Sequence, residues 1–199
     1  MKIVKELIVL LVSGGLLCGC ASYNTMSLPS ADVYAYSNRQ TQKDVTISVE
    51  FFDASKTQKI FKINLLRKGY QPVYIVIDNH SKETYLFNKS RISKACYDAS
   101  VIAEKCGFST AGRSTAYGVG ALFVWPLLVP AIVDGTGSAR ANTQMQSDYA
   151  TKEIKNGRIL PNGLLNGVVF VDKMANGEHF DIRLQNIETN EILLFNFIK

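Results

Sequence analysis

Short runs in which apolar and polar residues alternate are the feature that most limits what this chain can fold into. Such runs cover Val45–Phe51 and Phe180–Leu184, a β-branched run covers Val73–Ile77, and the largely apolar run Ile192–Phe197 predicts the closing strand. A two-residue period lets a strand bury one face, and β-branched residues favour strands. Many short strands separated by turns predict a mainly β fold, an antiparallel β-sandwich of immunoglobulin-like architecture.

Turn-forming residues separate these runs. Pro161–Gly163 predicts a turn, and Asn176-Gly177 is a strong hairpin signal. Glu188–Glu191 predicts the turn of a closing hairpin, and Asp53–Lys56 predicts another turn. The segment Ile60–Leu66 fits either a short helix or a strand.

An apolar segment interrupts the strand pattern. Residues 114–133 contain no formal charge, and Ala141, Met145 and Tyr149 then recur every four residues. This second spacing places the three side chains on one face of a helix. We therefore predict an inserted helical segment over about 113–156 within the β domain.

Three interpretations of residues 114–133 remain open. The length would span a bilayer, but Pro126 and Pro130 each remove a helical hydrogen bond that lipid does not replace. The segment would otherwise cover the sandwich as part of its core. In the third interpretation it stays partly exposed and meets a membrane or a partner. The residues of that candidate patch are Phe123, Trp125, Leu127 and Leu128.

The first twenty residues have the pattern of an export signal. Lys2 and Lys5 precede an uncharged apolar run, Leu7–Leu17, which is too short for an ordinary membrane-spanning helix. The tetrad Leu17-Cys18-Gly19-Cys20 resembles the lipobox of bacterial lipoproteins. The alternative is a plain secretory signal that leaves Cys20 as an ordinary thiol.

The resemblance implies that residues 1–19 are removed and that Cys20 is acylated and becomes the N-terminus. Ala21 follows the cysteine, which in this class implies transfer to the outer membrane, here expected to face the periplasm. Acyl chains anchor a protein without a transmembrane helix. We expect residues 20–44 to form a lipidated tether and residues 45–199 the folded domain.

Two cysteines remain after processing. Cys96 and Cys106 lie ten positions apart in an exported chain, so we predict a disulfide between them. A redox pair or a metal site is the alternative, but the spacing is not C-x-x-C and no histidine or acidic cluster adjoins it.

The charge distribution shows no cluster of basic residues of the kind that binds nucleic acid. The formal charge is +5, and it becomes +4 once residues 1–19 are removed. Basic residues are spread along the chain, and the group Lys152, Lys155 and Arg158 is interrupted by Glu153. We expect the membrane, through the lipid, and an envelope protein as partners, and no nucleic acid.

No catalytic motif is found in the sequence, and we expect no cofactor or metal. His80 lies in the turn-rich segment Asp78–Ser81 and His179 begins a strand, so both are expected on the surface. The sequence therefore predicts a non-enzymatic, lipid-anchored envelope lipoprotein that acts in envelope structure or partner binding. The alternatives are a membrane-inserting accessory protein that acts through residues 114–133, and an envelope hydrolase whose site residues are distant in sequence.

Overall fold

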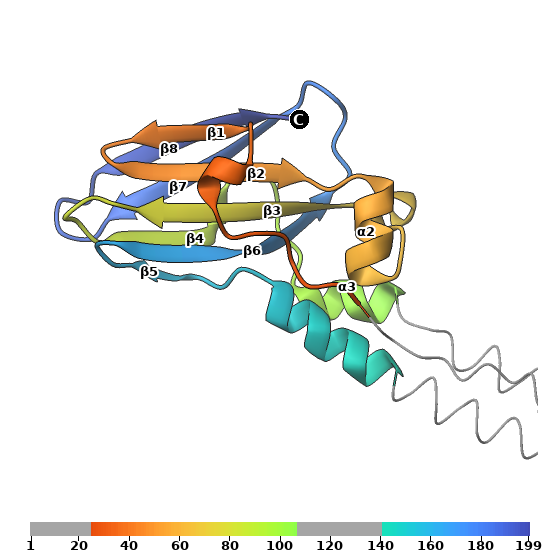
Figure 1. The fold of residues 1–199 in the computed structure, drawn as a ribbon. Helices are drawn as coiled ribbons and strands as arrows, with labels where there is room; N and C mark the ends of the chain where they lie inside the picture. The colour runs from red at the N-terminus through yellow and green to blue at the C-terminus, as the bar shows by residue number, and fades with distance from the viewer. Residues whose placement is uncertain (1–24, 107–140) are drawn as a thin grey trace, which may run out of the picture. The chain divides into compact units, whose positions relative to one another are not determined.

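The computed structural model describes residues 25–106 and 141–199, which contain two four-stranded antiparallel sheets (Figure 1). The mainly β class predicted from the sequence is confirmed. The first sheet has the order β1 (Arg39–Gln42), β2 (Val45–Phe51), β3 (Tyr70–Asn79), β6 (Gly163–Asp172). The second sheet has the order β5 (Gly157–Ile159), β4 (Tyr85–Ile92), β7 (His179–Asn186), β8 (Ile192–Ile198).

The two sheets differ in how many of their faces are covered. On β8, exposed residues alternate with the buried Leu193, Phe195 and Phe197, so this strand buries one face only. In β3, by contrast, residues 71–77 are all buried. The first sheet is therefore covered on both faces near its centre, and one of these faces contributes to the core between the sheets.

Helices and aromatic side chains cover the outer face of the first sheet. The helices are η2 (Val33–Ala35), α2 (Ala54–Phe61), η3 (Leu65–Lys68), α3 (Ala99–Cys106) and a helix over 141–152. Phe61 of α2 packs on Tyr149 and on Phe170 of β6, with ring centroids 4.8 and 5.4 Å apart. Ala141, Met145 and Tyr149 are all buried, which confirms the predicted helical face.

Capping side chains determine the secondary structure of Ile60–Leu66, which the sequence left open between a helix and a strand. Asp53 is not part of a free turn: its carboxylate accepts a hydrogen bond from the Lys56 amide at 2.7 Å and begins α2. Lys62 ends that helix in the left-handed conformation. Asn64 then caps η3 in the same way, through the Arg67 amide. The segment Ile60–Leu66 is therefore helical at both ends and contains no strand.

Apart from Asp53–Lys56, the predicted turns fall where expected, but one of them joins different strands from those predicted. The closing hairpin of β7 and β8 is confirmed, with His179 opposite Ile198. Asn176-Gly177 does form a turn, yet it connects β6 to β7, which belong to different sheets. A two-residue hairpin turn joins only hydrogen-bonded neighbours, whereas this six-residue connection, 173–178, crosses between the sheets.

Residues 25–44 belong to the folded part of the chain, which corrects the expected tether over 20–44. Val33 is buried, and the ring of Tyr36 packs against Tyr74 at 5.9 Å. Strand β1 pairs with β2 along its whole length. These contacts are tertiary, and the polar composition of the segment does not specify them.

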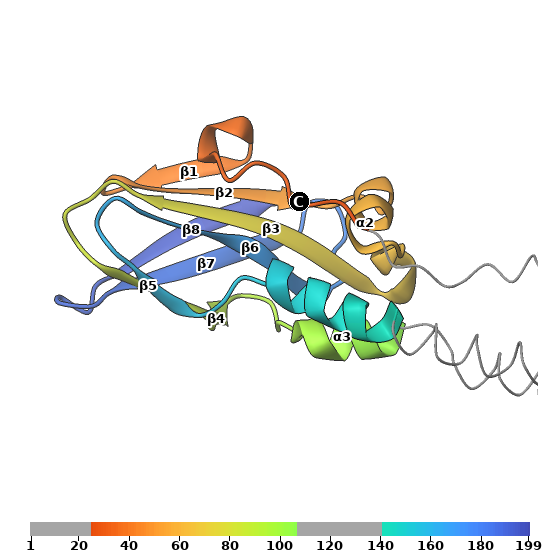
Figure 2. The same cartoon turned by 60° about the horizontal axis from the view of Figure 1, so that its bottom comes forward.

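Residues 25–106 and 145–199 are called the body below. Its cap end is the end where α2, η3, the last turn of α3 and residues 145–152 lie, beside the first residue of β3 (Figures 1 and 2). Its far end carries the β1–β2, β3–β4, β5–β6 and β7–β8 turns. Strand β3 runs from one end to the other and spans about 30 Å at 3.3 Å per residue.

Candidate functional site

The most elaborate arrangement of polar side chains at the cap end surrounds a buried lysine. The side chain of Lys152 is only 7% exposed, and its ammonium donates to Asp148 at 2.6 Å and to the Ile60 carbonyl at 3.0 Å. It also donates to the Thr25 hydroxyl at 3.1 Å and lies over the Phe61 ring. Burial lowers the pKa of Lys152, and the ion pair with Asp148 opposes that shift.

This arrangement fixes the start of the described chain to the body. The Thr25 hydroxyl donates to Asp148 at 3.0 Å, and the Met26 amide donates to the Lys59 carbonyl at 3.4 Å. Residues 25 and 26 are thereby attached to both α2 and the helix over 141–152. Thr25 lies five residues after Cys20, so at most about 17 Å of extended chain separates residue 20 from the body.

A cavity of about 830 Å³ lies between this N-terminal segment and α2. Its lining mixes apolar side chains with charged ones, of which Glu50 and Lys56 form an ion pair and Asp53 caps α2. The second carboxylate oxygen of Glu50 is buried and has no hydrogen-bond partner among the described residues. The lining includes hydroxyl groups but no histidine or cysteine, so it offers no nucleophile–base pair of the usual kind.

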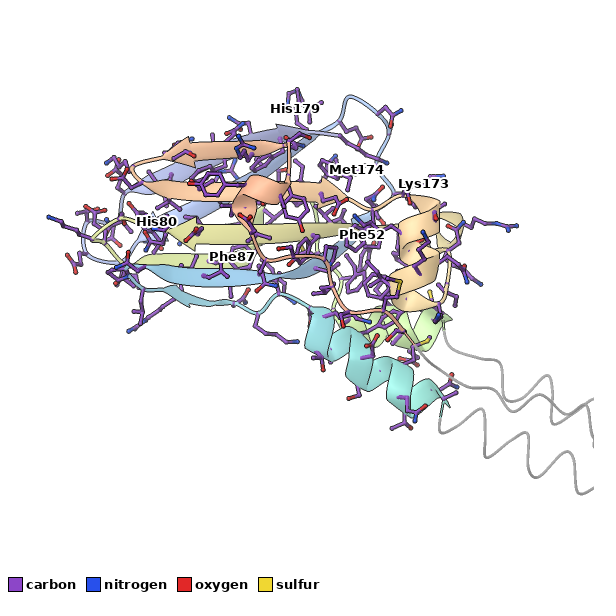
Figure 3. The ribbon with its side chains drawn as sticks, viewed as in Figure 1. Phe52, His80, Phe87, Lys173, Met174 and His179 are labelled. Atoms are coloured by element: carbon purple, nitrogen blue, oxygen red, sulfur yellow. The ribbon has the colours of Figure 1, made fainter. Side chains whose placement is uncertain are left out.

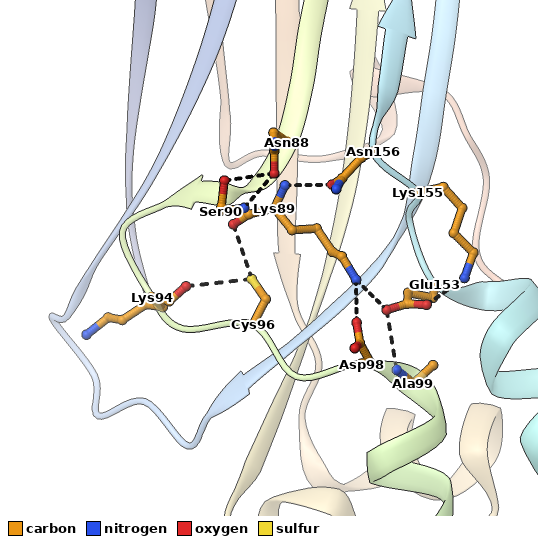
Figure 4. Close-up of polar contacts among 10 residues, drawn as sticks. All are labelled: Asn88, Lys89, Ser90, Lys94, Cys96, Asp98, Ala99, Glu153, Lys155 and Asn156. Atoms are coloured by element: carbon orange, nitrogen blue, oxygen red, sulfur yellow. Dashed lines mark hydrogen bonds and ion pairs between the residues drawn. The ribbon is translucent and has the colours of Figure 1, made fainter.

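A second polar cluster joins β4, α3 and the residues after the helix over 141–152 (Figure 4). The Lys89 ammonium pairs with Glu153 at 2.7 Å and with Asp98 at 3.0 Å, and Lys155 pairs with Glu153 at 2.5 Å. Burial alone would raise the pKa of Glu153, but the two lysines outweigh it and lower that pKa. The two lysines and two carboxylates balance in charge, so this cluster holds elements together rather than presenting an unpaired charge.

The predicted disulfide is absent: Cys96 and Cys106 are both free thiols. Cys106 ends α3, and Cys96 lies three residues before that helix begins. The eight-residue helix spans about 10 Å, whereas a disulfide needs Cα atoms within about 7 Å. Burial raises the pKa of Cys96 to about 11 and also raises the pKa of Cys106, which disfavours the reactive thiolate.

The two histidines lie apart on the surface, as the sequence predicts (Figure 3). His80 is at the far end, where its ring contacts Asp78 at 2.9 Å, and His179 begins β7. Across residues 25–106 and 141–199, no group of three potential metal-ligating side chains occurs. The same residues contain no helix that is long and apolar enough to cross a membrane.

The remaining predicted site residues lie outside the described part of the chain. They are Cys20 and the candidate patch residues Phe123, Trp125, Leu127 and Leu128. The arrangement around Lys152 was missed in the sequence because its partners are distant: Thr25 lies 127 residues from Lys152. Comparison with protein-family models, curated proteins and solved structures finds no match to the chain.

Proposed function

We propose that the chain is a non-enzymatic bacterial lipoprotein, acylated on Cys20, that serves envelope structure or binds an envelope protein. The outer membrane, on the periplasmic side, is the proposed location. The observation that supports it best is the attachment of Thr25, because a lipid five residues earlier would hold the body directly at the bilayer. The protein would then act within a short distance of the membrane rather than at the end of a long tether.

Replacement of Cys20 tests this proposal. Cys20→Ala should abolish acylation and release the protein from the membrane fraction, because no other acyl acceptor occupies the lipobox position. Cys18→Ala is the matched control, since this cysteine leaves with the signal and alanine suits the lipobox. Intact-mass analysis and membrane fractionation measure both effects. A Cys20→Ala protein that keeps its acyl mass and its membrane location would contradict the proposal.

We further propose that the sandwich is immunoglobulin-like. The strand order supports this: β2, β3 and β6 would correspond to strands A, B and E, and β4, β7 and β8 to C, F and G. Strand β5 would then lie beside C, and β1 would be an additional N-terminal strand. In this arrangement the helical insertion lies in the connection that follows strand C.

A second candidate function is membrane insertion through residues 114–133. The observation that favours it is the location of Cys106, eight residues before Ser114, at the same end of the body as Thr25. The unlipidated mature chain, Cys20→Ser, should then bind uncharged vesicles, and Trp125→Ser with Leu128→Ser should weaken that binding. If neither protein binds such vesicles, this candidate is eliminated.

A further inference from the structure

The cap end carries a group of exposed cations that the linear sequence does not reveal. Between Asp53 and Asp78 the chain contains five basic residues and no acidic one. Folding places Lys105 and Lys173 beside them: the Lys173 amide donates to the Gly69 carbonyl, and the Lys105 ammonium lies 5.9 Å from the centroid of the Tyr70 ring. We call the exposed members the basic cap: Lys59, Lys62, Arg67, Lys68, Lys105 and Lys173.

The charges of the basic cap are not neutralised by ion pairs. Within residues 25–106 and 141–199, none of the six cations forms an ion pair. The acidic groups at this end are fewer, and Asp148 and Glu50 are already paired with Lys152 and Lys56. Other acidic side chains at this end are Asp53, Glu104, Asp172 and Glu178, of which Glu178 pairs with Lys94.

The far end has the opposite balance of charge. Five carboxylates lie in or beside its turns, against three cations, one of which, Lys43, pairs with Glu191 at 2.5 Å. The carboxylates are Asp44, Asp78, Glu83, Glu188 and Glu191. The body therefore has a charge asymmetry along β3, with its positive end about 30 Å from its negative end.

We propose that the basic cap docks on an anionic bilayer surface and turns the cap end of the body toward the lipid. This rests on the proposed lipid anchor, which would bring that end within about 17 Å of the bilayer. An anionic surface attracts each nearby lysine or arginine and repels the carboxylates of the far end. The lipid would hold the protein on the membrane, and the basic cap would add an electrostatic attraction that fixes which end of the body faces it.

The test uses the mature chain, residues 20–199, with Cys20→Ser, so that acylation plays no part in the result. It should bind vesicles of phosphatidylglycerol and phosphatidylcholine, and high salt should release it because ions screen the attraction. Lys59→Gln, Lys62→Gln and Lys68→Gln combined should lower the partition coefficient roughly a hundredfold, at about fivefold per charge. The matched control, with the same net charge, combines Lys82→Gln, Arg158→Gln and Arg183→Gln and should change binding little.

Three outcomes would overturn the inference. Equal loss of binding in both triple variants would show that net charge, not the basic cap, attracts the protein. Equal binding to pure phosphatidylcholine would show that apolar insertion dominates. Absence of binding to anionic vesicles by the Cys20→Ser chain itself, with a thermal unfolding midpoint that shows it to be folded, would exclude the docking surface. None of these depends on whether Cys20 is acylated, which the mass of the wild-type protein decides separately.

Discussion

At the residue scale, Lys152 carries the connection between the N-terminal segment and the body. Its ammonium contacts Asp148, the Ile60 carbonyl and Thr25, so one side chain joins three segments that are distant in sequence. Burying a lysine is costly unless its donors are used, and here they are. The buried Lys152 therefore fixes the N-terminal segment in one position and contributes little net stabilisation.

Lys152→Met should lower the free energy of unfolding by about 2 kcal/mol, because Asp148 and the Ile60 carbonyl lose a charged donor. Urea unfolding measures this change, and limited proteolysis near Thr25 should become faster. Lys82→Met, at an exposed position, is the control and should stay within about 0.5 kcal/mol. Equal stability of the two variants would contradict the importance of this lysine.

The free cysteines give a second prediction at this scale. Cys106 is buried, and the pKa of Cys96 is raised to about 11 by burial, so its thiolate fraction at pH 8 is roughly a hundredfold below that of an ordinary thiol. In the Cys20→Ser chain, both thiols should react with a maleimide only after unfolding. Non-reducing mass analysis that finds a disulfide between them would instead support the sequence prediction.

At the scale of elements, the hydrophobic pattern predicted where the strands lie better than it predicted which strands pair. The alternating run Phe180–Leu184 became part of β7 in the half-covered sheet, whereas the alternating run Val45–Phe51 became β2 in the sheet covered on both faces. The continuous run Val73–Ile77 became β3, which is buried on both faces. Pattern does not say which strands pair, so Asn176-Gly177 was assigned to a hairpin that does not form. Helix α2 was missed because its Asp53 cap has the same composition as a turn.

Gly167 tests how residues 153–154, which follow the helix over 141–152, are attached to the first sheet. The Ile154 amide donates to the Val168 carbonyl at 3.0 Å along the edge of β6, and a Cβ at position 167 would lie 2.6 Å from the Ile154 nitrogen. Gly167→Ala should therefore cost about 3 kcal/mol of unfolding free energy.

Gly157→Ala is the matched control, because a Cβ there meets nothing within 4 Å. It should change stability by about 0.5 kcal/mol or less. Denaturant unfolding of both variants measures the difference. A Gly167→Ala protein as stable as Gly157→Ala would mean that residues 153–154 move away from β6 at no cost.

At the scale of the whole molecule, the proposed lipid anchor and the basic cap lie at the same end of the body. The sequence predicted export and lipidation at Cys20 but treated residues 20–44 as a tether. The contacts that fold residues 25–44 onto the body, such as Thr25 to Asp148, join positions 123 residues apart, and no local pattern encodes them. The basic cap escaped notice for the same reason, since its cations gather only when α2, η3, α3 and the β6–β7 connection meet.

The orientation of the acylated protein on anionic vesicles tests the central claim most directly. A fluorophore is attached through Ser55→Cys on α2 or through Lys82→Cys at the far end, and quenching by a headgroup-labelled lipid is measured. The account predicts strong quenching at position 55 and little at position 82, which lies about 30 Å farther along the body. Equal quenching at the two positions, or stronger quenching at position 82, would contradict it.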